Sequence, residues 1–315
     1  MGVGRGRGGP SPPEASAPQR KSPTRLSLNL RFSRNSSRSR KGTESSLSHC
    51  LAEMTLPRRK TLGLLPADIS QKGRFSMSIA TMISRRRSVR AYKAEAINVA
   101  TLADLRAYMN QLVPLIPGAK VEGRIIPTDH GSYWQKWKTP HFIAIFSDGS
   151  DDALINVGFM YQQLDLYAQS LGLGTCWVGL GNLTDAESVP EGMKLAVMMA
   201  IGIPDDVPER TAADFKRKVM TEIADQPDNR LEALRLAPSA TNSQPWYVTH
   251  DGDTLHIWRE ELGLIKQRTL GRMNKIDMGI GLSHLYVENP ETFCFRKEEN
   301  PPSLEGQIYI GSVTL

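Results

Sequence analysis

A run of arginines broken by a serine and a valine, RRRSVR, occupies positions 85–90 of this 315-residue chain. Guanidinium groups bind phosphate oxygens through paired, charge-assisted hydrogen bonds, and a neighbouring hydroxyl can add another. The run therefore fits a receptor for a phosphate ester. A solvated basic surface would have the same composition, so the run alone leaves both interpretations open.

A glycine-rich segment, GLGTCWVGLG, occupies positions 172–181. It matches neither the dinucleotide-binding fingerprint nor the phosphate-binding P-loop. Its glycines would let the backbone approach a flat ligand, and Cys176, Trp177 and Val178 could wall a ring. The alternative is a helix end followed by an ordinary core strand.

An uncharged polar block, APSATNSQPW, occupies positions 237–246. Pro238 restricts the chain, and Ser239, Thr241, Asn242 and Gln244 supply a row of side-chain donors and acceptors. Such a row suits a ligand with carbonyl and N–H edges or a polyol chain. A capping loop is the alternative, although a cap needs fewer polar residues.

Metal chemistry and nucleophilic catalysis find little support in the sequence. There is no HExxH motif. The three cysteines are far apart and form no CxxC pair, so a zinc ribbon or a disulfide scaffold is not expected. This cysteine usage favours a reducing compartment. His250 and His256 flank a predicted turn, and we interpret them as part of a solvated hairpin in preference to a two-ligand metal site. No run of 18 apolar residues is present.

Alternating helical and extended patterns must position these three segments. The clearest pattern is an apolar seam that follows Asp151, with Leu154, Val157, Tyr161, Leu164, Ala168 and Leu171 at spacings of three and four. It predicts a long core helix or one member of a pseudo-symmetric helix pair. Other predicted helices cover 79–86, 99–113, 231–236 and 277–287. Predicted strands cover 124–127, 142–146, 195–203, a hairpin at 246–258, 292–295 and 307–313. This succession indicates an α+β or α/β protein.

The net charge of +6 is concentrated in the N-terminal tail. Residues 1–76 hold 15 Lys/Arg and 4 Asp/Glu, which leaves 24 basic and 29 acidic residues in the remainder. The tail is rich in Ser, Arg, Pro and Gly, so we expect it to be disordered. It could be a transit peptide, a nucleic-acid-binding arm or dispensable sequence upstream of a start at Met77 or Met82, and we favour the last.

Taken together, RRRSVRAY, SLGLGTCWVG and LAPSATNSQPW resemble the FMN-dependent nitroreductase family. Their order resembles the single-chain, TM-type subfamily, in which the APS-N-QPW block follows the glycine-rich segment, and KIDMGIGLSHLYV resembles that subfamily's final helix. The resemblance covers 77–287. It implies an α+β, nitroreductase-like fold whose two halves, 77–208 and 209–315, are fused as a pseudo-dimer.

The resemblance also implies the residues that bind FMN. Arg86, Arg87, Ser88 and Arg90 would hold the phosphate and ribityl chain, with a looser match at Lys216 and Lys218. Cys176, Trp177, Val178 and Gly179 would line the isoalloxazine ring. The second half would close the site with Pro238, Ser239, Ala240, Asn242 and Gln244. Because that half reads DNRLEALRLAPS where a second arginine block would stand, we expect one flavin per chain.

The activity implied by the resemblance is an FMN-dependent NAD(P)H oxidoreductase. It would transfer two electrons in a ping-pong reaction to a nitroaromatic, a quinone or a similar acceptor, with no catalytic side chain because the flavin carries the chemistry. A non-catalytic flavin-binding or redox-sensing protein is the alternative. We expect a cytoplasmic protein, with organelle import by the tail if the source is eukaryotic. Membrane and nucleic-acid partners are not expected, and a pseudo-dimeric chain can function as a monomer.

Overall fold

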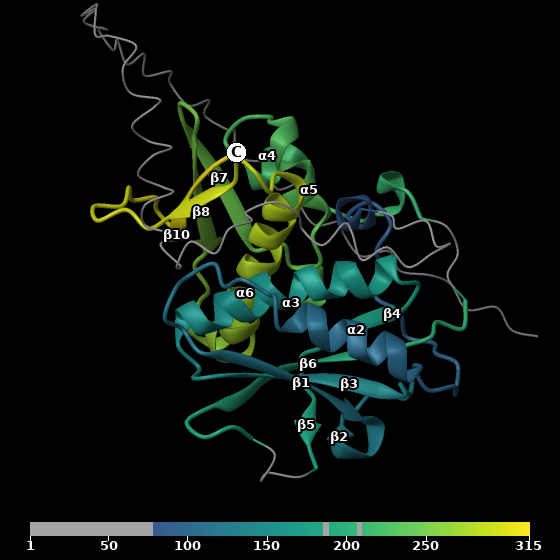
Figure 1. Cartoon of the computed structure of the whole chain (residues 1–315). Coiled ribbons are helices and arrows are strands. Elements are labelled where there is room, and N and C mark those ends of the chain that lie inside the picture. Colours follow the sequence, from purple (N-terminus) through teal and green to yellow (C-terminus); the bar gives the residue numbers. More distant parts are fainter. Residues whose placement is uncertain (1–77, 185–188, 207–209) are drawn as a thin grey trace, which may run out of the picture. The chain divides into compact units, whose positions relative to one another are not determined.

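The computed structural model describes residues 78–184, 189–206 and 210–315. All of these belong to one compact unit, Leu47–Leu315, in which two successive halves each build a four-stranded antiparallel sheet (Figure 1). The tail at 1–76, with its three interpretations, lies outside the described residues. Among the described helices, none is both long enough and apolar enough to cross a bilayer.

The first half is a sheet of order β1-β3-β6-β4 with helices on one face. Its elements are η1 (Ile79–Met82), α2 (Val99–Met109), β1 (Val121–Pro127), η2 (Thr128–His130), β2 (Gly131–Ser132), β3 (His141–Ser147), α3 (Asp151–Ser170), β4 (Gly174–Val178), β5 (Asn182–Leu183) and β6 (Lys194–Gly202). Helices α2 and α3 cover one face, and the β2–β5 pair lies on the opposite side (Figure 1). Helix α3 begins at the predicted residue because the Ser150 side chain accepts a hydrogen bond from the Ala153 amide at 3.2 Å.

The second half is a sheet of order β7-β8-β10-β9. Its elements are η4 (Ala212–Asp214), α4 (Met220–Ile223), η5 (Asn229–Leu231), α5 (Glu232–Leu236), η6 (Ala240–Asn242), β7 (Trp246–Asp251), β8 (Thr254–Glu260), α6 (Leu264–Glu288), β9 (Cys294–Arg296) and β10 (Gln307–Thr314). The predicted hairpin is confirmed, with a turn at Asp251–Gly252 where Gly252 has a φ of 59°.

The two halves share one topology. In each, a short helix precedes an antiparallel strand pair (β1–β3 or β7–β8), and a long helix follows (α3 or α6). The next strand takes the sheet edge (β4 or β9), and the last strand inserts between that edge and the pair (β6 or β10). The predicted α+β class is confirmed, and this duplication is what a fused pseudo-dimer requires.

Helices α3 and α6 make the most extensive helix–helix contact between the halves (Figure 1). They cross at two glycines. A Cβ on Gly158 would overlap the carbonyl oxygen of Ile276, and a Cβ on Gly279 would overlap that of Ile155. Both pairs of equivalent residues, Gly158 with Gly279 and Ile155 with Ile276, are 121 positions apart. The crossing therefore lies on an approximate twofold axis, and the predicted apolar seam of α3 is buried there.

Three predicted element boundaries are wrong. The helix predicted over 79–86 is only η1, because the chain turns after Met82 and becomes extended to bridge Ser88 with Thr175. The helix predicted over 99–113 ends at Met109, and Val113 precedes a proline, which disfavours helical backbone. The helix predicted over 277–287 is α6, which begins thirteen residues earlier at Leu264.

Candidate functional site

Arg86 anchors the candidate site from a buried position. Its side chain is 2% exposed, and its Nε donates to Asp165 Oδ2 on α3 at 2.8 Å. The next residue, Arg87, is held through its backbone amide, which donates to Gln169 Oε1 at 3.0 Å. The extended segment then joins the edge of the first sheet, where the Val89 amide donates to the Thr175 carbonyl at 2.8 Å.

Two further arginines from the polar stretch between the halves join this position. Arg210 donates from Nη1 to the Arg86 carbonyl at 2.8 Å. The guanidinium carbons of Arg210 and Arg217 lie 3.6 and 5.2 Å from the ring centroid of Phe215, so both cations contact one aromatic side chain. We refer to Arg86, Arg87, Arg210 and Arg217 as the arginine cluster.

The arginine cluster carries more positive charge than its surroundings neutralise. Burial, followed by the charges of Arg86 and Arg210, lowers the pKa of Arg217 to about 10. Burial also lowers the pKa of Arg210, followed by repulsion from Arg86 and Arg87. Two buried nitrogens, Arg86 Nη2 and Arg87 Nε, have no hydrogen-bond partner. Unpaired donors among like charges are costly unless an anion binds them.

A buried polar network connects the arginine cluster to the glycine-rich strand. Gln162 Nε2 donates to Asp165 Oδ2 at 2.8 Å and contacts His284 Nε2 at 3.2 Å, while Gln162 Oε1 accepts from the Trp177 indole at 3.1 Å. His284 Nδ1 lies 3.0 Å from the Ala233 carbonyl. Burial lowers the pKa of His284 to about 3, so this imidazole is neutral and spans α6 and α5 as a donor and acceptor.

Strand β4 presents its predicted ring-lining residues to two different faces. Cys176 and Val178 are buried with Phe142, Met198 and Ala200 in a cluster on the face away from α3. Trp177 is half-buried and points to the opposite face, toward Gln162. A planar ligand at this edge strand can therefore meet the side chains of only one face, together with the backbone. Burial raises the pKa of the Cys176 thiol, so it is not an activated nucleophile.

Gly179 lies where β4 leaves the sheet. A Cβ at this position would be 3.3 Å from the Met273 sulfur of α6, and Arg272 Nη1 donates to the Leu195 carbonyl at 3.4 Å. The edge of the first sheet thus faces the N-terminal part of α6. A ligand bound along β4 would lie between residues of both halves.

The polar block after α5 uses most of its side chains to hold the basic segment in place. Asn242 Nδ2 donates to the Lys216 carbonyl at 2.9 Å, and Asn242 Oδ1 accepts from Arg217 Nη1 at 2.7 Å. Gln244 Oε1 accepts from the Lys218 amide at 2.7 Å. Thr241, Asn242 and Gln244 all have positive φ, so the block is a tight and strained loop.

Asp277 holds this loop from α6. Its Oδ1 accepts a hydrogen bond from the Ala240 amide at 2.9 Å, and its buried Oδ2 has no hydrogen-bond partner. Burial raises the pKa of Asp277 to about 7. The residue 121 positions earlier, Asn156, performs the same task in the first half, where its Oδ1 accepts from the amides of Leu115 and Ile116 at 3.0 and 2.9 Å. The loop is therefore positioned by a twofold-related helix contact.

Most of the predicted site residues lie in one region of the structure, although they differ in their burial and in the contacts that they make. Arg86 and Arg87 belong to the arginine cluster, Ser88 and Thr175 form a bridge, and Arg90 is exposed. Lys216 is exposed and contributes only its carbonyl, whereas Lys218 Nζ donates to the Gln244 carbonyl at 3.1 Å. Pro238 is buried, and Ser239 Oγ accepts from the Gln244 amide at 2.8 Å.

Sequence analysis did not identify Arg210, Arg217, Asp165 and Asp277. A signal for Arg217 was present: Phe215 is apolar, and in an extended segment residues two apart share a face. Phe215 is buried, Lys216 is exposed and Arg217 is half-buried, as that alternation requires. Asp165 and Asp277 lie on helices among apolar neighbours, and an acid in an apolar helix indicates a buried polar contact.

Comparison with known proteins confirms the predicted nitroreductase-like fold. The chain belongs to the family described as "Putative TM nitroreductase", whose model matches residues 78–289. Membership of this family identifies an oxidoreductase. Among curated proteins, none is significantly similar to this chain.

A solved structure shares the fold over most of the chain. A protein described as a "putative nitroreductase" from Thermotoga maritima is 21% identical, with a TM-score of 0.53 over 78% of this chain and 97% of that chain. Smaller nitroreductases match about half of this chain. One from Desulfitobacterium hafniense with bound FMN is 15% identical, with a TM-score of 0.36 over 45% of this chain and 100% of that chain. An FMN-dependent nitroreductase from Clostridium difficile is 17% identical, with a TM-score of 0.37 over 45% and 98%.

Proposed function

We propose that the protein is an FMN-dependent NAD(P)H oxidoreductase of nitroreductase type. The observation that carries this proposal is the arginine cluster on a nitroreductase fold, with two buried guanidinium nitrogens that lack partners. A phosphate ester carries a charge of about −1.5 to −2 at neutral pH and several acceptor oxygens, which matches these donors. The residues therefore fit the phosphate of FMN.

The chain's own residues would bind and orient the cofactor. Arg87 and Arg217 would neutralise the phosphate, while Arg86 is fixed by Asp165 and turns its free nitrogen toward it. Trp177 and the backbone around Gly179 would contact the ring. The loop at 238–244, held by Asp277, would close the site from the second half. The polar network through Gln162 would keep the phosphate and ring ends at a fixed separation.

Bound FMN would supply two-electron chemistry and so couple oxidation of NAD(P)H to reduction of a nitroaromatic, quinone or similar acceptor. No protein group needs to act as a nucleophile. The buried Cys176 thiol and the neutral His284 imidazole are consistent with this division of labour.

We further propose that the two halves are a fused pseudo-dimer with one flavin. The topology is duplicated, but the region around Tyr286, which the 121-position spacing relates to Asp165, packs against Phe159 and Phe293. In the second half, an aromatic cluster thus occupies the position at which Asp165 holds Arg86 in the first half. Among the described residues of that half, no buried arginine held by a helix carboxylate stands at this equivalent position.

Titration with FMN tests the proposal. We expect saturation at about one FMN per chain, followed by steady-state NAD(P)H oxidation whose double-reciprocal plots against acceptor are parallel, as a ping-pong reaction requires. Stoichiometric FMN without turnover for any nitroaromatic or quinone would instead favour a flavin-binding or redox-sensing protein. Saturation at two FMN per chain would contradict the single-site proposal.

A further inference from the structure

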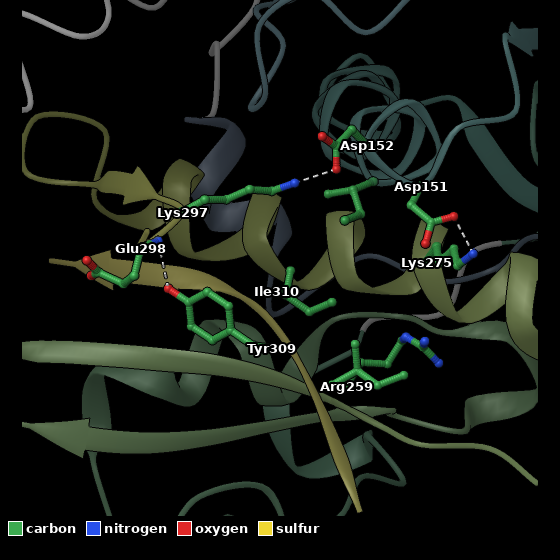
Figure 2. A pocket seen from close by; sticks show the side chains of 10 residues that line it. Asp151, Asp152, Arg259, Lys275, Lys297, Glu298, Tyr309 and Ile310 are labelled. Carbon is green, nitrogen blue, oxygen red and sulfur yellow. Dashed lines mark hydrogen bonds and ion pairs between the residues drawn. The ribbon is translucent and has the colours of Figure 1, made fainter. Parts of the chain in front are cut away.

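A cavity of about 210 Å³ lies beside the N-terminal end of α3, against Lys275 of α6 (Figure 2). Asp151, Asp152 and Ile155 of α3 face it, together with Lys275 of α6 and residues of β8 and β10. Figure 2 shows Lys275 and Lys297 pointing at the two aspartates, with Arg259 below them.

The pseudo-twofold axis relates this cavity to the ring end of the flavin site. Asp151 is the counterpart of Arg272 at the spacing of 121 positions, and β9 occupies in the second sheet the edge position of β4. Around the flavin site, Arg272 contacts the start of β6; around the cavity, Asp151 lies by Ile308 at the start of β10. The duplication has therefore left a second hollow at an equivalent place.

Every charged lining residue except Arg259 has a partner of opposite charge. Lys275 pairs with Asp151, Lys297 Nζ lies 2.6 Å from Asp152 Oδ1, and Glu298 Oε1 accepts from Arg296 Nε at 2.8 Å. Arg259 has no ion pair within 4.0 Å in the described part of the chain. Arg259 is thus the one charged lining residue without a direct ion pair in the described part of the chain, and Asp151 and Glu261 act on it only from a greater distance.

Arg259 is also nearly inaccessible to solvent. It is 3% exposed, its Nε has no hydrogen-bond partner, and its Nη1 reaches only the Glu260 carbonyl at 3.3 Å. A buried guanidinium N–H without an acceptor is unfavourable, and a bound anion would supply that acceptor. Burial lowers the pKa of Arg259, while the more distant charges of Asp151 and Glu261 act in the opposite direction.

The remainder of the lining is apolar. Ile155 and Ile310 are 4% and 7% exposed, and the side chains of Ile308 and Tyr309 complete the wall. A volume of about 210 Å³ is below the range of about 300–1,000 Å³ that is typical of sites for drug-sized ligands, so FMN would not fit. The occupant must be small, with one negative group and a short hydrocarbon body.

We propose that this cavity binds a small organic monocarboxylate. Its carboxylate accepts two hydrogen bonds from the Arg259 guanidinium, and its hydrocarbon body packs on Ile155 and Ile310. This site is separate from the arginine cluster and does not depend on the flavin chemistry. Because α3 and α6 border both sites, occupancy stabilises the crossing that also carries Asp165 and Asp277.

Butyrate is a suitable probe, with inorganic phosphate as the comparison anion. We expect calorimetric titration of the full chain, saturated with FMN, to show one butyrate bound per chain and a thermal midpoint that rises with butyrate concentration. Arg259→Met keeps the aliphatic stem and should weaken butyrate binding at least about ten-fold. Arg259→Lys keeps the charge without the fork and should weaken it by a smaller factor.

Arg230→Met is the matched control, since Arg230 is 40% exposed and pairs with Asp228 outside the cavity. Its butyrate affinity should equal that of the wild type. No butyrate binding, unchanged binding in Arg259→Lys and Arg259→Met, phosphate binding as tight as butyrate, or competition between butyrate and FMN would each overturn the proposal. FMN affinity is measured in the same samples, so failure of the flavin proposal is distinguishable.

Discussion

At the scale of single residues, the proposed cofactor site depends on the arginine cluster. Sequence analysis located two of its four members, because RRRSVR is a recognisable run. It selected Lys216 and Lys218 where the structure uses Arg217, since a basic triplet does not reveal which of its members points inward. Because Phe215 is buried, Arg217, two positions later in an extended segment, points to the same inward side. Contacts such as Arg210 with the Arg86 carbonyl depend on tertiary structure and have no local signal.

The arginine cluster yields a direct prediction about cofactor affinity. Replacing Arg217 or Arg87 by Met removes charge-assisted hydrogen bonds of roughly 1.5–3 kcal/mol each, so the dissociation constant of FMN should rise about ten-fold to a hundred-fold. Quenching of flavin fluorescence measures it. Arg230→Met should leave the constant unchanged. Equal FMN affinity in wild type and Arg217→Met would place the phosphate elsewhere.

Asp277 predicts a pH dependence of stability. Its pKa is raised to about 7 in the folded protein and is about 3.9 when unfolded, so its favourable contribution is complete below pH 4 and is lost as pH rises to about 7. Asp277→Asn keeps the acceptor for the Ala240 amide and cannot ionise. At pH 8 it should be more stable than the wild type, by up to about 4 kcal/mol at about 1.4 kcal/mol per pKa unit.

Urea unfolding at pH 5 and pH 8 measures this difference. The advantage of Asp277→Asn should be about 4 kcal/mol at pH 8 and should fall to about 1.5 kcal/mol at pH 5, where most of the unfolded chains but few of the folded ones carry an ionised carboxyl. Asp253→Asn, at an exposed position in the β7–β8 turn, serves as the control and should show no such change. The same advantage at both pH values would show that the carboxyl does not titrate between them.

At the scale of elements, the crossing of α3 and α6 organises both halves. The apolar seam of α3 predicted this helix and its burial, because its periodicity is strong and its N-cap is clear. The first turns of α6 were missed because they carry no buried stripe: Leu264 and Ile265 are 87% and 84% exposed. Periodicity identifies the part of a helix that packs and says little about an extension into solvent.

Gly158 and Gly279 allow the two helix backbones to approach closely. Gly158→Ala or Gly279→Ala would insert a methyl group against a backbone carbonyl, which cannot move as a side-chain tip can. We expect a loss of about 3 kcal/mol of unfolding free energy from overpacking. Gly263→Ala is the control, since no atom lies within 4 Å of its Cβ position, and it should cost less than about 1 kcal/mol. Thermal denaturation distinguishes them.

At the scale of the whole molecule, two halves of one topology differ in what their equivalent sites hold. In the proposed site, Arg86 and Arg87 of the first half and Arg210 and Arg217 of the second would bind one phosphate. The equivalent helix position, at Tyr286, is packed with aromatic side chains, and a small cavity lies at the start of α3. The motif order predicted the fusion, because the APS-N-QPW block comes last. The twofold spacing and the second cavity could not be predicted, since the halves no longer share a sequence pattern.

The tail yields a prediction at this scale. Because the family match begins at residue 78, a chain that starts at Met77 should fold and bind FMN within about two-fold of the full-length affinity. Weak, salt-sensitive binding of RNA by the full chain, if observed, should vanish in this truncated chain. Loss of FMN binding on truncation would contradict the assignment of the site to residues after Met77.

The most direct test of the flavin oxidoreductase proposal is an anaerobic absorbance spectrum of the purified protein. We predict a yellow protein, or one that becomes yellow after incubation with FMN and gel filtration, and loss of the oxidised flavin absorbance when NADH or NADPH is added. Adding a nitroaromatic or quinone should restore it. A colourless protein that retains no FMN would contradict the account.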